Sequence, residues 1–243
     1  MEILGEFKTV DSLPCLLCES IGAVVLSDLH VGIEIVQAGS GVFMPKFQTK
    51  DLLKELKTIR RTTRADTLII NGDTKHYFRA NNHREKEEVE RFLRKLSMIF
   101  KDIIIVKGNH DSAIEVHTES YNNIEVYDEY RDGEFFFIHG HKDVEIPEGV
   151  KYVVIGHEHP ALELKDDIGI KEKIPAFLFA SRDDFNVVVL PAYSKVASGT
   201  SVNTVPQHQL LCPFLREEGV RHMEAVGVDR EAGTFKFPRL DMI

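Results

Sequence analysis

Hydrophobic residues in this chain concentrate in short continuous runs, and five of these runs end beside an aspartate, an asparagine or a histidine. The five runs occupy residues 23–27, 67–71, 103–107, 135–138 and 152–155. Continuous β-branched and aromatic runs of this length are typical of strands that are buried on both faces. In open α/β sheets, sites form beyond the carboxyl ends of such strands. The pattern therefore predicts one site that is assembled from five separate stretches of sequence.

The segments between the runs predict a layered α/β fold. Apolar residues recur at helical spacing over residues 46–64 and again over residues 83–100, so each segment is expected to form an amphipathic helix. The glycines and the proline in residues 31–45 indicate an irregular loop that overhangs the site. Strand and helix alternate through residue 106, which favours βαβ units.

After Asp111 the pattern changes to short strands with brief connections. The expected strands lie at 124–127, 135–138, 150–155, 176–180 and 187–190, and residues 224–237 resemble a hairpin. Two sheets packed face to face, with helices outside, would bury all of these runs. No linker rich in Pro, Gly or Ser separates the two halves, so we expect a single domain over residues 1–243.

Composition excludes several classes of protein. The chain has 243 residues and a formal net charge of −9, which makes it a poor candidate for broad, sequence-independent duplex binding. The N-terminus lacks the regions of a signal peptide and no apolar stretch has the length of a membrane span, so we expect a cytoplasmic protein with no membrane partner. Cys15 and Cys18 form a lone C-x-x-C, and the leucines between them favour a buried strand over a redox motif.

Seven polar residues that follow the apolar runs form a ligand set suited to metal ions: Asp28, His30, Asp73, Asn109, His139, His157 and His159. Carboxylate, imidazole and amide oxygen suit Mn²⁺, Fe²⁺, Zn²⁺ or Co²⁺ better than a thiolate-loving metal or Ca²⁺. Seven ligands are too many for one tetrahedral ion, but they suit two ions that share a bridging carboxylate. In Asp28-x-His30 and in His157-x-His159, the outer side chains of an extended segment would point the same way and reach one ion.

Taken together and in this order, these blocks resemble the signature of calcineurin-like metallophosphoesterases. The resemblance spans residues 28–159 and rests on Asp28-x-His30, Gly72-Asp73, Gly108-Asn109-His110-Asp111, His139 and Gly156-His157-x-His159. Each block alone is a weak signal, whereas five in order after apolar strands are a strong one. The segments 72–76, 156–160 and 191–193 look like the ICC-like, SbcD-related branch of archaea and bacteria, which includes DNA ligase-associated phosphoesterases.

The resemblance implies a four-layer α/β/β/α sandwich and a role for each matched residue. One divalent ion would bind Asp28, His30 and His159, the other would bind Asn109, His139 and His157, and Asp73 would bridge them. Manganese is the expected metal, and iron, zinc, cobalt or nickel also fit. A hydroxide between the ions would attack phosphorus, His110 would protonate the leaving oxygen, and Asp111 would orient His110.

The expected activity is hydrolysis of phosphodiesters such as cyclic nucleotides or nucleic-acid ends, and the diester preference follows from the resemblance alone. One alternative is a phosphomonoesterase or nucleotide pyrophosphatase on the same scaffold, with Lys75, Lys142 and Arg182 as extra cations. Another is a non-catalytic metallophosphoesterase-like binding module, although such a module should have lost ligands. His76 is a candidate substrate-binding residue. The sequence leaves open the roles of His141 and of residues 193–200, and it does not give the oligomeric state.

Overall fold

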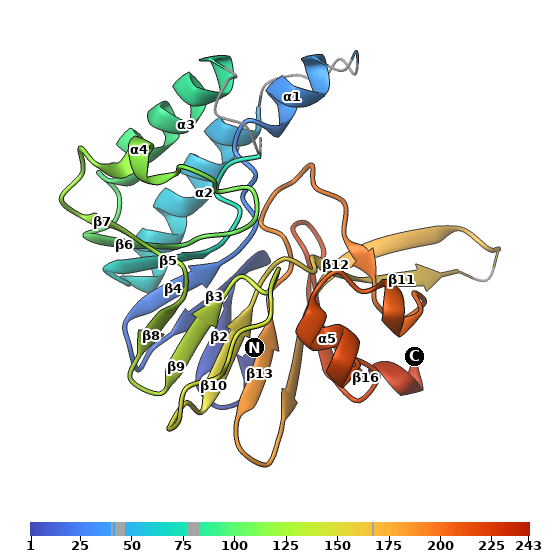
Figure 1. Ribbon diagram of the computed structural model, residues 1–243. Helices are drawn as coiled ribbons and strands as arrows, with labels where there is room; N and C mark the ends of the chain where they lie inside the picture. Colours follow the sequence, from blue (N-terminus) through green and yellow to red (C-terminus); the bar gives the residue numbers. More distant parts are fainter. Residues whose placement is uncertain (40, 42–46, 77–82, 167) are drawn as a thin grey trace.

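Two stacked β-sheets flanked by helices make up the protein, as the computed structural model shows for residues 1–39, 41, 47–76, 83–166 and 168–243 (Figure 1). Among these residues the first sheet has seven strands in the order β1-β2-β3-β4-β5-β6-β7. Its strands are β1 (Glu2–Ile3), β2 (Phe7–Val10), β3 (Leu13–Cys18), β4 (Ala23–Leu26), β5 (Thr67–Asn71), β6 (Asp102–Val106) and β7 (Ile124–Tyr127). Strands β4 to β7 run parallel, so their carboxyl ends meet at one edge of the sheet.

The second sheet has nine strands in the described chain, in the order β14-β11-β12-β13-β10-β9-β8, with β15 and β16 attached beside β12. Its strands are β8 (Tyr130–Asp132), β9 (Phe135–Ile138), β10 (Tyr152–Ile155), β11 (Pro160–Lys165), β12 (Lys171–Ser181), β13 (Asn186–Val189), β14 (Thr200–Ser201), β15 (Glu224–Asp229) and β16 (Gly233–Arg239). β9, β10 and β13 pair in parallel, so this sheet also has an edge where carboxyl ends meet.

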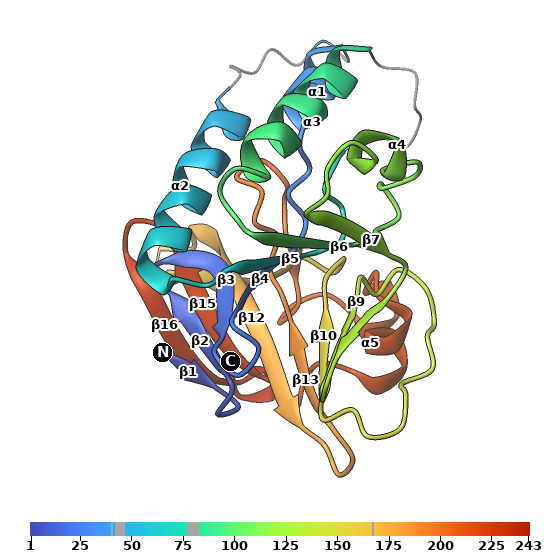
Figure 2. The same ribbon diagram turned by 90° about the vertical axis from the view of Figure 1, so that its left-hand side faces the viewer.

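Helices form the outer layers. The long helices α2 (Gln48–Thr63) and α3 (His83–Leu96) lie on the first sheet beside the short helices α1 (Ile33–Gly39) and α4 (Glu115–Thr118) (Figure 2). Helix α5 (Pro213–Glu218) lies on the second sheet, and two 3₁₀ turns cover residues 207–209 and 240–242. No helix of the described residues is both long and apolar enough to cross a membrane.

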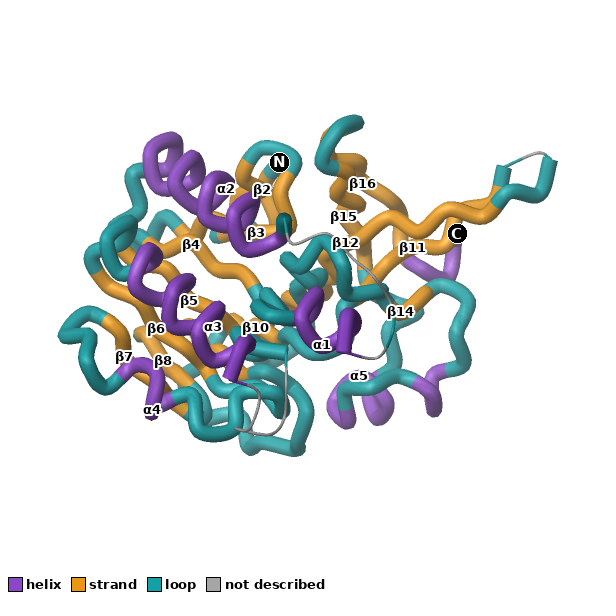
Figure 3. The backbone as a smooth tube through the Cα atoms, turned by 90° about the horizontal axis from the view of Figure 1, so that it is seen from above, coloured by secondary structure: helices purple, strands orange, loops and turns teal. Residues whose placement is uncertain are grey.

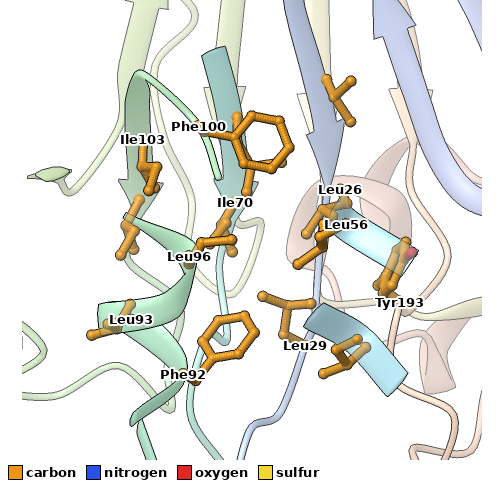
Figure 4. Packing of buried hydrophobic residues seen from close by; sticks show 14 of the residues in the cluster. Leu26, Leu29, Leu56, Ile70, Phe92, Leu93, Leu96, Phe100, Ile103 and Tyr193 are labelled. Carbon is orange, nitrogen blue, oxygen red and sulfur yellow. The ribbon is translucent and has the colours of Figure 1, made fainter. Parts of the chain in front are cut away.

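Successive side chains of the central strands point to opposite faces of their sheet. Both faces are covered by apolar layers, which is why the runs are apolar throughout. In β4, Leu26 packs against the helices, whereas its neighbour Val25 faces the second sheet. Figure 4 shows the helix side of this arrangement, where Leu56 and Phe92 of two helices pack beside Leu26 and Ile70 of two strands. Alternation continues in the second sheet, whose outer residues pack in a third cluster that includes Leu215 of α5. The four-layer sandwich expected from the sequence is confirmed.

One element differs from the sequence expectation. Residues 31–45 were expected to form a loop, but Ile33–Gly39 form α1, and residues 40 and 42–46 lie outside the described chain. The helix forms because Ile33 and Ile35 are buried, and this burial outweighs the weak local helical signal. Glu34 also accepts hydrogen bonds from the backbone amides of Phe47 and Gln48, which helps to begin α2.

Candidate metal centre

The predicted ligands converge where the carboxyl ends of both sheets meet. The segment after β4 runs along the segment after β5, because the amide of Asp28 donates to the carbonyl of Gly72 at 3.0 Å and that of His30 donates to Asp73 at 2.9 Å. Asn71 at the end of β5 joins the two sheets, since its side-chain amide donates to the carbonyls of Ile138 at 2.9 Å and Val154 at 3.1 Å. Five sequence segments therefore share one site, as the sequence predicted.

The backbone at the ligands has an unusual conformation. Nine described residues other than glycine have a positive φ, and five of them are Asp28, His30, Asp73, His157 and His159. The expectation that Asp28-x-His30 and His157-x-His159 are extended segments is therefore wrong. Left-handed residues turn the chain sharply and bring alternate side chains to the site, while the intervening Leu29 packs in the helix-side core. Such conformations are costly and cluster at functional sites.

A first group of ligand atoms comes from Asp28, His30 and His159, whose candidate ligand atoms all lie within 4.8 Å of one another. Nε2 of His159 lies 3.0 Å from Oδ1 of Asp28 and 3.4 Å from Nε2 of His30. Oδ1 of Asp28 is buried and receives no hydrogen bond of proper geometry from the described residues. A buried, unsatisfied carboxylate oxygen facing imidazole nitrogens fits a bound divalent cation.

A second group comprises Asp73, His139 and His157, again within 4.8 Å of one another. Nε2 of His139 lies 3.5 Å from Oδ2 of Asp73 and 3.2 Å from Oδ1 of Asn109, so Asn109 adjoins this group. Nδ1 of His139 donates to the carbonyl of Asn71 at 3.1 Å, which leaves Nε2 as the candidate ligand atom. Oδ2 of Asp73 also lies 3.9 Å from Nε2 of His30, so this carboxylate stands between the two groups.

The electrostatics of the site separate its imidazoles into two kinds. Burial lowers the pKa of His30 to about 3 and the pKa of His157 to about 4, so both imidazoles are neutral near neutral pH and could act as ligands. Burial also acts on His139, but the hydrogen bond to Asp73 and the charges of Asp28 and Asp73 raise its pKa to about 9. In Asp28, burial opposes ionisation, yet the neighbouring imidazoles led by His159 hold the pKa of its carboxyl below the usual range.

His110 lies beside the second group, and its ring contacts both the backbone and the ring of His76. The ring Nδ1 donates to the carbonyl oxygen of His76, and Nε2 lies 3.8 Å from Oδ2 of Asp73. The ring of His76 stacks on that of His110, with centroids 5.3 Å apart, and its Nδ1 lies 3.3 Å from Nδ1 of His30. Nε2 of His110 thus faces the space between the ligand groups, and His76 adjoins it.

Asp111 and Lys75 are buried, and their side chains form hydrogen bonds that hold the loops around His110 together. The carboxylate of Asp111 accepts backbone amides from Gly108, Thr74 and Lys75, each at 3.1 Å, so it joins the segment after β5 to the segment after β6. Burial raises the pKa of Asp111 to about 6. Nζ of Lys75 donates to the carbonyl of His110 at 2.5 Å and is therefore directed into the protein rather than into the cavity.

Residues 193–198, whose role the sequence left open, form one wall of the site. They run beside the candidate ligands. The backbone amide of Ser194 donates to the carbonyl of Asp28 at 3.1 Å, and the carbonyl of Ser198 accepts from Nδ1 of His159 at 3.4 Å. His141 lies near the site as well, with its ring centroid 5.4 Å from that of His139. Nδ1 of His141 is buried without a hydrogen-bond partner among the described residues.

Gln48 was missed by the sequence reasoning, since its contacts are far apart in the chain. It is buried at the start of α2, and its side-chain Nε2 donates to the backbone carbonyls of Leu29 and His30, both at 3.2 Å. Its oxygen accepts from the hydroxyl of Ser194 at 2.8 Å and from the amide of Lys195 at 3.2 Å. Gln48 therefore ties the segment that carries His30 to the wall formed by residues 193–198.

An open cavity of about 430 Å³ lies over the ligands. Five histidines line it together with Asp73 and Asn109, and Ile33, Val196 and Leu211 give it apolar walls. None of the described residues that line it is lysine or arginine. Of the cations considered for a monoesterase, Arg182 pairs with Glu218 and Lys142 is exposed outside the lining.

A two-sheet sandwich whose strand ends gather aspartate, asparagine and histidine around an open cavity defines a metal-dependent phosphoesterase. The sequence profile of the family described as calcineurin-like phosphoesterase matches residues 23–221. The chain therefore belongs to the calcineurin-like phosphoesterase family, as the resemblance of its motifs implied. Family membership and the histidine and aspartate groups of the site together indicate divalent metal ions as cofactors.

Two solved structures are similar to this chain. The nuclease MPE of Pseudomonas putida aligns with a TM-score of 0.66 and 20% identity over 98% of each chain. Yfce, a phosphoesterase from E. coli, aligns with a TM-score of 0.41 and 16% identity over 72% of this chain and 83% of its own. A search of the curated proteins finds no match to the chain.

Proposed function

We propose that the protein is a dinuclear phosphodiesterase, with one ion held by Asp28, His30 and His159 and a second ion held by Asn109, His139 and His157. Asp73 would bridge the two, since its carboxylate adjoins both groups. The single observation that carries the proposal is the pair of ligand groups, Asp28–His30–His159 and Asp73–His139–His157, in which Oδ2 of Asp73 also lies 3.9 Å from Nε2 of His30 in the other group. When bound, two such ions supply a water that is acidic enough to attack at neutral pH, and they stabilise charge on the phosphoryl oxygens.

His110 is the proposed proton donor to the leaving oxygen. Its Nδ1 is held by the carbonyl of His76, which fixes the orientation of the ring and directs Nε2 to the site. A ring held in this way can transfer a proton at Nε2 without serving as a ligand. His76 supports the ring by stacking and lines the cavity, so it is proposed to contact the substrate.

The diester preference is supported by the lining of the cavity. A phosphomonoester carries nearly one additional negative charge at neutral pH and benefits from further cations. The described part of the lining offers no lysine or arginine, whereas Ile33, Val196 and Leu211 offer apolar surface for an organic substituent. A nucleotide or nucleic-acid diester has such substituents on both sides of phosphorus, and the protein of the same fold from Pseudomonas putida is a nuclease.

The experiment compares one diester and one monoester with the same leaving group. Metal-stripped protein is reloaded with Mn²⁺, the bound metal is counted by elemental analysis, and rates are measured on bis(p-nitrophenyl) phosphate and p-nitrophenyl phosphate. We expect two ions per chain and faster hydrolysis of the diester. Faster hydrolysis of the monoester would favour the phosphomonoesterase alternative, and inactivity on both substrates would contradict the proposal.

A further inference from the structure

The outer face of α2 carries an unbroken stripe of positive charge. The five members of this α2 stripe are exposed and recur every three or four residues: Lys50, Lys54, Lys57, Arg61 and Arg64. Helical spacing places the first four opposite the buried Leu52, Leu56 and Ile59, and Arg64 follows directly as the left-handed residue that caps the end of α2. At 1.5 Å per residue the helical part of the stripe, from Lys50 to Arg61, is about 16 Å long.

Acidic side chains of the same helix are turned away from the stripe. Asp51 and Glu55 pair with Lys195 at 3.2 Å and 2.9 Å, and Glu55 also lies 3.6 Å from Arg230. No member of the α2 stripe forms an ion pair with a described residue. Five cations in a line that pair with no described residue are notable in a chain whose net charge is −9.

The stripe borders a hollow that is lined in part by apolar side chains. A surface cavity of about 500 Å³ is lined by Lys54, Lys57, Arg61 and Arg64 together with Met98 and Ile99 beyond the end of α3. Met98 is 82% exposed, which is unusual for a large apolar side chain without a partner. α2 and α3 lie side by side on this face of the molecule (Figure 3). Cations beside apolar surface match a chain of phosphates that alternates with sugars and bases.

The helix that bears the stripe begins at the metal centre. Gln48, two residues before Lys50, donates to the carbonyl of His30, and the stripe leads from there toward Arg64. We propose that the α2 stripe is a docking surface for single-stranded nucleic acid, one of whose diesters enters the metal centre. A single line of cations on an otherwise acidic protein favours one strand over a duplex, since the second strand would meet repulsion. This inference builds on the proposed function and names the substrate class.

The test separates docking from catalysis. Fluorescence anisotropy measures binding of a labelled 30-nucleotide single-stranded DNA to the metal-stripped protein over a range of salt concentrations. The stripe variant is K54Q/K57Q/R61Q/R64Q, in which glutamine preserves helix propensity. The matched control, K8Q/K151Q/K171Q/K236Q, removes the same charge from four exposed lysines on strands or loops outside α2.

The parent and the control are expected to bind the oligonucleotide with similar affinity, and the stripe variant about 10- to 100-fold more weakly. Each lost phosphate contact lowers the slope of log K against log salt by about 0.7, so four losses lower it by roughly 3. All three proteins should hydrolyse bis(p-nitrophenyl) phosphate at equal rates, because this small diester does not reach the stripe.

Equal oligonucleotide affinity and salt dependence in the parent and the stripe variant would overturn the docking surface. Equal weakening in the control and the stripe variant would overturn it too, because net charge alone would then explain binding. Stripe-dependent binding by a parent that hydrolyses no diester would instead leave the docking surface standing and contradict the proposed catalytic function.

Discussion

Nε2 of His30 lies 3.4 Å from Nε2 of His159, although 129 residues separate the two histidines in the sequence. Two imidazole nitrogens this close cannot both carry a proton without strong repulsion. Burial keeps His30 neutral by lowering its pKa to about 3, so its ring retains a lone pair that can bind a cation beside Asp28 and His159. The two imidazoles are thus arranged to bind one cation together. Binding of that cation should therefore displace protons from the site.

Metal binding is expected to release protons. In the metal-free protein Asp73 and Asp28 raise the pKa of His139 to about 9, so this residue is protonated at about pH 7.5 and must lose its proton to become a ligand. The charge of Asp28 also raises the pKa of His159 against the effect of burial. Titration calorimetry with Mn²⁺ in Tris and in HEPES should give different enthalpies, corresponding to at least one proton released per chain. Identical enthalpies in the two buffers would contradict this account, and His139→Asn should reduce the difference.

The sequence was sufficient to predict the layers and the convergence of the candidate ligands because both depend on local patterns. Apolar runs such as residues 67–71 identify buried strands, and polar residues that follow parallel strands must meet at one edge. The predicted strand at 135–138 coincides with β9. Helix ends were less accurate, since the predicted helix over 83–100 ends at Leu96.

What the sequence could not provide depends on contacts between distant segments. The hydroxyl of Ser194 reaches Gln48 across 146 residues, and no periodicity in either segment indicates this contact. The left-handed conformation of Asp28 is likewise imposed by its neighbours, because its local sequence carries no glycine or turn signal that requires it. Helix α1 forms for a similar reason, since the burial of Ile33 and Ile35 decides its conformation.

Replacement of His110 should affect substrates according to their leaving group. Removal of a proton donor costs about 10²–10⁴-fold when the leaving group is an alkoxide, but far less when it leaves readily as an anion. His110→Ala should therefore hydrolyse bis(p-nitrophenyl) phosphate at nearly the parent rate and a dinucleotide much more slowly. Elemental analysis should find the parent metal content, because the residue is not a proposed ligand. Equal loss on both substrates, or loss of metal, would argue for a different role.

Gln48→Met should weaken metal binding without removing any ligand. Methionine has a similar size but cannot replace the four side-chain hydrogen bonds to Leu29, His30, Ser194 and Lys195. Loss of contacts that orient ligands typically costs 10- to 100-fold in metal affinity. Competition with a chromogenic chelator measures this affinity, and Gln48→Glu should restore part of it because Ser194 and Lys195 can still donate. Gln209→Met, at an exposed position, provides the control, and parent-like affinity in Gln48→Met would refute the positioning role.

Gly72 is expected to be indispensable because the ring of His139 occupies the space where a side chain would lie. A Cβ atom at residue 72 would come within 1.9 Å of Nδ1 of His139, and the φ of +99° is itself unfavourable for alanine. Gly72→Ala should displace His139, lower the stoichiometry of bound metal and decrease the free energy of unfolding by roughly 1–3 kcal/mol. Gly5→Ala is a matched control, since Gly5 has a φ of +77° but no atom within 4 Å of a built Cβ. Denaturant titration and elemental analysis of both variants separate backbone strain, which they share, from displacement of the ligand. If Gly5→Ala and Gly72→Ala lost stability equally and both retained the parent metal content, the close approach to His139 would have no role in the site.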